Sequence, residues 1–75
     1  MTPDKLIRMA NQMADFFRAA EPDKASAEVA GHINSFWEPR MRAQLLDHVE
    51  AAGAGGLDPL AREALPLIAD PRQAA

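Results

Sequence analysis

Apolar residues recur every three or four positions along the first part of the chain, which predicts an amphipathic helix over residues 3–20. Thr2 can cap the free N–H groups at its start, and Pro3 suits the first helical position. The apolar arc covers nearly half of the helix circumference and comprises Leu6, Ile7, Met9, Ala10, Met13, Ala14, Phe16, Phe17 and Ala20. This arc is wider than one neighbouring helix needs, so we expect the helix to make two separate contacts.

Two further helical patterns follow after a short turn. Asp23 can cap a helix over residues 24–37, and Pro39 prevents that helix from simply continuing. Pro39 also suits the opening of a helix over residues 40–52, and Gly53 supplies a residue for the left-handed conformation after it. The apolar stripes of these helices are Ala25, Val29, Ile33, Phe36 and Trp37, followed by Met41, Leu45, Leu46, Val49 and Ala52.

A fourth, short helix is predicted over residues 59–65, because Asp58 and Pro59 repeat the pattern of a cap followed by proline. Pro66 lacks a backbone donor, so this helix should end or kink about two residues before it. Residues 70–75 have the composition of a frayed, flexible tail.

The sequence therefore predicts an all-α fold, a small antiparallel three-helix core with a short fourth C-terminal helical segment. Alternating apolar patterns are absent, Tyr is missing and β-branched residues are few. At 75 residues the chain has room for one domain, residues 1–75. Domains of this size bury only about 60% of their unfolded surface, so stability should come from helix packing or from another protein.

Composition narrows the classes of partner. The chain has no Cys, which removes disulfides and thiolate metal sites. Its 8 Lys and Arg against 11 Asp and Glu argue against a nucleic-acid-binding role. Its first residues show no basic region followed by an unbroken apolar run, and no stretch approaches the length needed to span a bilayer, so we expect no membrane association and a cytoplasmic setting.

The residues capable of catalysis or metal binding form no recognisable site. His32 and His48 are the two imidazoles, and neither lies beside a second ligand at the spacing of a zinc motif. Glu28 and His32 have the spacing of a weak ion pair, and His32 should pack half-buried beside Phe36. The Ser and Thr residues lack a triad arrangement, and the glycines after residue 52 lack the Lys of a phosphate loop. We therefore expect no catalytic residue, no metal site and no bound cofactor.

Aromatic and sulfur side chains are concentrated in two segments, residues 5–17 and 32–42. These segments hold all three Phe, the single Trp and every Met except the initiator. Such side chains at helical spacing usually form a core, which explains most of them. Trp37 lies at the end of its helix beside a proline corner, where a core plug and an interface anchor are equally good interpretations.

Arg40 and Arg42 are placed in the first turn of the third predicted helix, where the helix dipole opposes positive charge. Arg42 falls inside the apolar arc, whereas Arg40 points away from it. Arg42 could lay its aliphatic stem over the core and reach toward Glu38. Alternatively, it could pair with a carboxylate or phosphate of a partner, which we favour because Trp37 and Met41 lie at the same corner.

The same segments resemble a known family, the delta subunit of soluble, NAD-dependent, molybdenum-containing formate dehydrogenases. The resemblance covers roughly residues 3–62, and the string from Phe36 to Arg42 is its most specific element. It rests on Lys5-Leu6-x-Arg8-Met9-Ala10-Asn11-Gln12-Met13-Ala14-x-Phe16-Phe17, His32-Ile33-x-x-Phe36-Trp37-x-Pro39-Arg40-Met41-Arg42 and Gly55-Gly56-Leu57-Asp58-Pro59-Leu60. Pro66 and the residues after it do not follow the family pattern.

This resemblance implies a non-catalytic accessory subunit of a bacterial cytoplasmic complex. The catalytic alpha subunit of such enzymes carries the bis-molybdopterin guanine dinucleotide cofactor and iron–sulfur clusters, and other subunits bear flavin and bind NAD. By this analogy the chain holds no cofactor and binds the alpha subunit, supporting its stability or assembly.

Two alternatives stay open, a transient maturation factor for cofactor loading of the catalytic subunit and a self-associating helical interaction module. Under any of them, the resemblance and the concentration of contact residues lead us to expect an interface that includes Arg8, Asn11, Phe16, Phe36, Trp37, Arg40, Met41 and Arg42.

Overall fold

The computed structural model describes residues 1–73, and it confirms the all-α fold class. Its four α-helices are α1 (Pro3–Ala20), α2 (Ala25–Phe36), α3 (Pro39–Ala52) and α4 (Pro59–Ala64). Single turns of 3-10 helix form η1 (Pro22–Lys24), η2 (Leu65–Leu67) and η3 (Pro71–Gln73). None of the helices within residues 1–73 is both long and apolar enough to cross a membrane.

Local backbone chemistry sets most of the helix ends as predicted. The Thr2 hydroxyl accepts a hydrogen bond from the Lys5 N–H at 3.3 Å, and the Asp58 carboxylate accepts one from the Leu60 N–H at 2.9 Å. Gly53 follows α3 with a φ of +87°, a conformation that side chains with a Cβ rarely adopt. The fourth helix ends before Pro66 and continues only as a 3-10 turn.

The predicted cap of the second helix is wrong. Lys24, not Asp23, occupies the capping position of α2, and its side chain makes no capping hydrogen bond. Pro22 begins a 3-10 turn in which the Lys24 N–H donates to the Glu21 carbonyl at 3.0 Å. Asp23 therefore lies inside that turn, one position too early to cap the helix.

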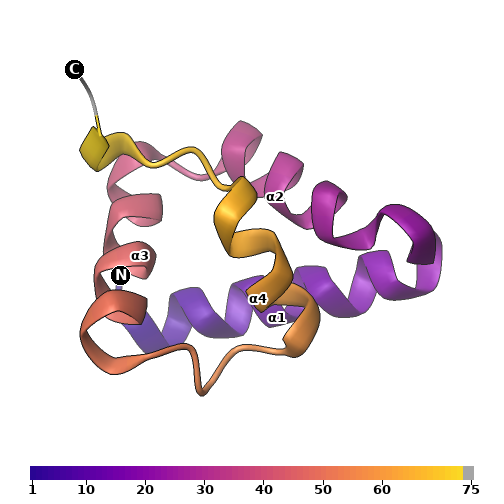
Figure 1. The fold of residues 1–75 in the computed structure, drawn as a ribbon, viewed down its shortest axis with the longest axis horizontal. Helices are drawn as coiled ribbons and strands as arrows, with labels where there is room; N and C mark the ends of the chain where they lie inside the picture. The colour runs from indigo at the N-terminus through magenta and orange to yellow at the C-terminus, as the bar shows by residue number, and fades with distance from the viewer. Residues whose placement is uncertain (74–75) are drawn as a thin grey trace.

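Figure 1 shows how the helices are arranged. α1 and α2 run in opposite directions, whereas α3 runs across one end of this pair and α4 lies against both α1 and α2. The sequence predicted that the first helix makes two separate contacts, and the structure has three, because α1 packs against α2, α3 and α4.

The core is made of aliphatic side chains, many small alanines and one tryptophan. Small side chains at helix contacts let the helix axes come close together. The fourth segment contributes more to this core than a peripheral attachment would, because Leu57, Ala61 and Ala64 are all buried. The buried residues are Leu6, Ala10, Ala14, Ala25, Val29, Ala30, Ile33, Trp37, Leu45, Leu57, Ala61, Ala64 and Ile68.

The segment after α4 is held against the body of the protein, which differs from the frayed tail expected over residues 70–75. Asn34 of α2 donates to the Leu67 carbonyl at 3.1 Å and accepts from the Ala69 N–H at 2.8 Å. Ile68, between them, is buried. Residues 66–73 are called the C-terminal strap below, and residues 74–75 lie outside the described part of the chain.

Arg72 fastens the end of the strap to α3. Its guanidinium contacts the carboxylates of Asp47 and Glu50, each at 2.6 Å, and that of Asp70 at 2.8 Å. The pKa of Arg72 is raised by these carboxylates. Arg72 also holds the pKa of the Asp70 carboxyl at about 2, below its ordinary value of 3.8.

We expect Gly53→Ala to lower the free energy of unfolding by about 1 kcal/mol, because alanine is strained at positive φ. Urea unfolding would measure the change. Gly55→Ala is the matched control, since φ is not positive there and no heavy atom lies within 4 Å of an added Cβ. Equal stability of the two variants would contradict the role given to Gly53.

The Asp70 pKa predicts that the strap loosens in acid. A carboxyl whose pKa is depressed by folding stabilises the folded state above its ordinary pKa, and this contribution is lost as pH falls from about 4 to about 2. NMR titration of the Asp70 carboxyl should give a midpoint near 2. Arg72→Gln should return that midpoint toward the ordinary value, and a normal midpoint in the parent protein would refute the contact.

Candidate functional site

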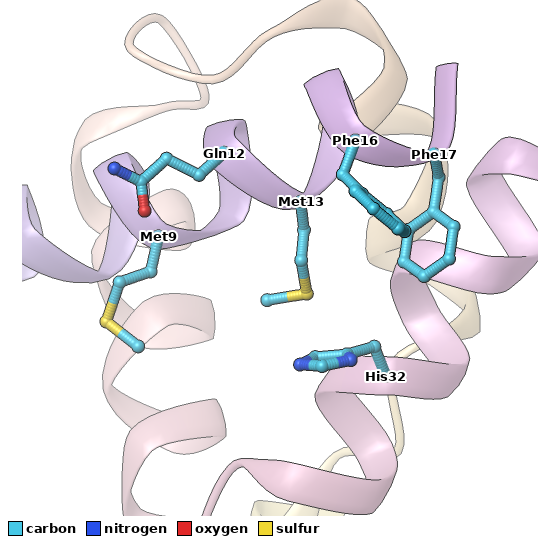
Figure 2. Close-up of a pocket in the computed structure, with 6 residues that line it drawn as sticks. All are labelled: Met9, Gln12, Met13, Phe16, Phe17 and His32. Carbon is cyan, nitrogen blue, oxygen red and sulfur yellow. The ribbon is translucent and has the colours of Figure 1, made fainter. Parts of the chain in front are cut away.

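An open apolar groove of about 300 Å³ lies between α1 and α2. Figure 2 shows the side chains that line it, with Met9, Met13 and His32 directed into a shared space. Four of the lining residues follow one stripe of α1, and the others complete the wall from the end of α1 and from α2. The lining residues are Met9, Gln12, Met13, Phe16, Phe17 and His32. This groove is called the Met–Phe groove below.

A continuous row of rings runs along one side of the Met–Phe groove. The Phe16 and Phe17 rings meet edge to face with centroids 5.0 Å apart, and the Phe17 centroid lies 6.4 Å from that of His32. The His32 ring in turn lies 4.5 Å from Phe36. His32 is half-buried beside Phe36, as predicted. Two separate helices thus contribute to one aromatic surface.

The chemistry of the groove is that of a contact surface. Its polar groups are the Gln12 amide and the His32 imidazole, and no carboxylate or cation lines it. Glu28 and His32, which have the spacing of a weak ion pair, are not among the ion pairs of residues 1–73. Within those residues no group of three or more His, Asp or Glu side chains could hold a metal ion. Soft methionines and rings favour the binding of apolar side chains.

The predicted interface residues divide into two sets in the structure. Phe16 and Phe36 are exposed to 64% and 73%; Phe16 lines the Met–Phe groove, and the Phe36 ring lies against that of His32, which also lines it. Arg8 and Arg40 are also exposed. Trp37 and Met41 pack in or against the core, and Asn11 and Arg42 bind the backbone of the chain itself. The eight residues therefore do not form one patch.

Trp37 is a core residue, which decides between its two interpretations. Only 5% of its surface is exposed, and it joins the hydrophobic cluster at the corner between α2 and α3. Met41 beside it is half-buried and packs against the same cluster.

Arg42 binds the chain itself, by neither of the two routes foreseen for it. Its Nη1 donates to the Trp37 carbonyl at 2.9 Å and its Nε to the Ala69 carbonyl at 3.0 Å. The Trp37 carbonyl lies at the C-terminal end of α2, where a helix dipole favours positive charge. The positive charge of Arg42 is unfavourable at the start of α3, but its guanidinium lies at the C-terminal end of α2, where positive charge is favourable.

Asn11 also has an internal role. Its Nδ2 donates to the Gly56 carbonyl at 3.0 Å, and its Oδ1 accepts from the Asp58 N–H at 2.8 Å. This pair of bonds fixes the loop that leads into α4. Nearby, the Arg18 guanidinium contacts Asp58 at 2.5 Å. The Leu60 N–H, and after it Arg18, lower the pKa of the Asp58 carboxyl.

Sequence reasoning missed most of the residues that line the Met–Phe groove, namely Met9, Gln12, Met13, Phe17 and His32. The width of the apolar arc on the first predicted helix was the one feature of the sequence that could have indicated them. One face of the first helix carries Met9, Gln12, Met13 and Phe16. The core does not need this face, so its side chains are left for another contact.

These features define a small all-α protein in which an exposed apolar groove, rather than a set of catalytic side chains, is the candidate site. The model of one family, described as the NADH-dependent formate dehydrogenase delta subunit FdsD, matches residues 5–65. The chain belongs to this family. No curated protein and no solved structure matches it. The matched range begins within α1, includes α2, α3 and α4, and ends at Leu65, where the last 3-10 turns begin.

We expect Arg42→Ala to reduce the free energy of unfolding by about 2 kcal/mol, since it removes a charged donor from two carbonyls. Arg40→Ala, in the same helical turn but exposed, should change it by less than about 0.5 kcal/mol. Chemical denaturation of both variants would measure the difference. If Arg42→Ala were as stable as the parent and only lost a partner, Arg42 would be an interface residue after all.

Proposed function

We propose that the chain is a non-catalytic accessory subunit that binds the catalytic alpha subunit of a cytoplasmic, NAD-dependent, molybdenum-containing formate dehydrogenase. The family match over residues 5–65 carries this proposal. In such an enzyme the alpha subunit would hold the molybdenum cofactor, and other subunits would hold flavin and bind NAD. The delta chain would stabilise the alpha subunit or support its assembly.

The character of the exposed surface supports this role. The Met–Phe groove offers rings and thioethers for contact, and it lacks a nucleophile or a pair of carboxylates for acid–base chemistry. Phe16 and Phe36 are large apolar side chains left in water, a feature that often marks a surface for another protein.

The size of the chain also favours a role in a complex. Six of the thirteen buried residues are alanines, which bury little apolar area each, and a partner that binds only the folded state adds to the stability of the chain. The net charge of −3 provides no general attraction for nucleic acid.

A pull-down with the tagged chain from the cells that produce it would test the proposal. After a wash at moderate salt, we expect mass spectrometry to identify the catalytic subunit of a formate dehydrogenase. Metal analysis of the same material should find molybdenum and iron, and the fraction should oxidise formate with NAD.

Each alternative has its own outcome in this experiment. A catalytic subunit that is recovered without molybdenum would favour a transient maturation factor. Recovery of the tagged chain with only further copies of itself would favour a self-associating module and overturn the proposal. Formate oxidation by the purified chain alone would contradict its non-catalytic role.

A further inference from the structure

We propose that the Met–Phe groove binds an amphipathic helix of the alpha subunit, which inserts apolar side chains between α1 and α2 and places acidic residues beside Lys5 and Arg8. This inference rests on the proposed function and specifies the contact surface that it requires. It gives the groove one kind of occupant, an apolar helix face with a negative end.

The fold covers only one side of the α1 and α2 pair. Residues two positions apart on a helix point about 200° apart, toward opposite faces. Asn11 follows Met9 by two positions, and Asn34 follows His32 by two. Both asparagines bind the segment that contains α4, whereas Met9 and His32 line the groove. The fourth helix therefore lies on the face opposite the groove.

The C-terminal strap also binds away from the groove. Asn34 and Arg42 hold its backbone, and Arg72 fastens it to Asp47 and Glu50 of α3. The described part of the chain therefore leaves Phe16 and Phe36 exposed to 64% and 73%.

The shape of the groove favours a helix over a small molecule. Its volume of about 300 Å³ lies at the lower end of the range for small-molecule pockets, and it is an open groove rather than an enclosed cavity. Met9, Gln12, Met13 and Phe16 present the row of side chains into which a neighbouring helix packs. Methionines adapt to the shape of the side chains that enter.

The charges beside the groove favour acidic residues on that helix. Lys5 precedes Met9 by four positions and so lies one turn before the lining, whereas Arg8 directly precedes Met9; both side chains are exposed. The ion pairs among residues 1–73 use Arg18 and Arg72, which leaves these two cations available. Glu28, one turn before His32, is the acidic residue on the α2 side of the groove. The complementary helix is thus negative near Lys5 and Arg8 and carries a basic residue near Glu28.

The test measures binding of the full chain to the purified alpha subunit. Phe16→Glu and Phe36→Glu should each weaken affinity about tenfold or more, because a charge would enter the apolar contact. Leu67→Glu is the matched control, since Leu67 is 52% exposed on the strap and outside the groove. It should bind like the parent, and circular dichroism should show equal helix content in all variants.

The charge requirement is tested separately with the double variant Lys5→Glu and Arg8→Glu. We expect about a fivefold loss of affinity at low salt that diminishes as salt is raised. Unchanged affinity at low salt would overturn the acidic character of the partner helix.

The outcomes separate this inference from the proposed function. If the parent binds the alpha subunit and both Phe variants bind equally well, the groove is not the contact surface, while the proposed function stands. If the parent does not bind at all, both fail. If the parent forms a dimer that Phe16→Glu converts to a monomer, the occupant is a second copy and the inference is overturned.

Discussion

Two asparagine side chains hold the fourth helix in place, and the arrangement of the other elements depends on that attachment. Asn11 of α1 binds the backbone on both sides of Leu57, and Asn34 of α2 binds it on both sides of Ile68. Each carboxamide uses one donor and one acceptor, so it binds a backbone carbonyl and a backbone N–H at the same time, which among side chains only asparagine and glutamine do with an amide. The net gain is about 1 kcal/mol per hydrogen bond, and it also fixes which apolar residues enter the core. Leu57 and Ile68 are buried because the backbone beside each of them is bound in this way.

Arg42 completes the attachment at the corner between α2 and α3. It joins the carbonyl of Trp37, the capping residue of α2, to the C-terminal strap, so a single guanidinium of α3 holds the end of α2 and the strap 27 residues further along the sequence. Trp37 fills the space beneath this corner. A charge that is unfavourable at the start of its own helix is thereby stabilised by the end of another. The string from Phe36 to Arg42, the most specific element of the family resemblance, thus includes two residues, Trp37 and Arg42, that stabilise the fold itself.

The sequence predicted well those features that depend on neighbouring residues. The caps at Thr2 and Asp58, the positive φ of Gly53 and the stop before Pro66 each follow from backbone chemistry within one helical turn. The contacts of Asn11 and Arg72 could not be predicted, because they join residues whose proximity is decided only when the helices pack. The candidate site was predicted in part for the same reason. Phe16 and Phe36 could be named from their chemistry, but the sequence could not show that α4 would cover one face of α1 and leave the other exposed.

The use of both faces of α1 has an energetic consequence for so short a chain. A 75-residue protein gains stability from every large apolar side chain that it buries, yet two of its three phenylalanines are mostly exposed. Turning the face of Phe16 inward would require rotating α1, which would break the Asn11 bonds and remove Leu6, Ala10 and Ala14 from the core. The asparagine attachment thus fixes the orientation of α1 and, with it, the exposure of the Met–Phe groove. A surface kept exposed in this way contributes little to the folding of the chain alone, and its apolar area remains available to stabilise a complex.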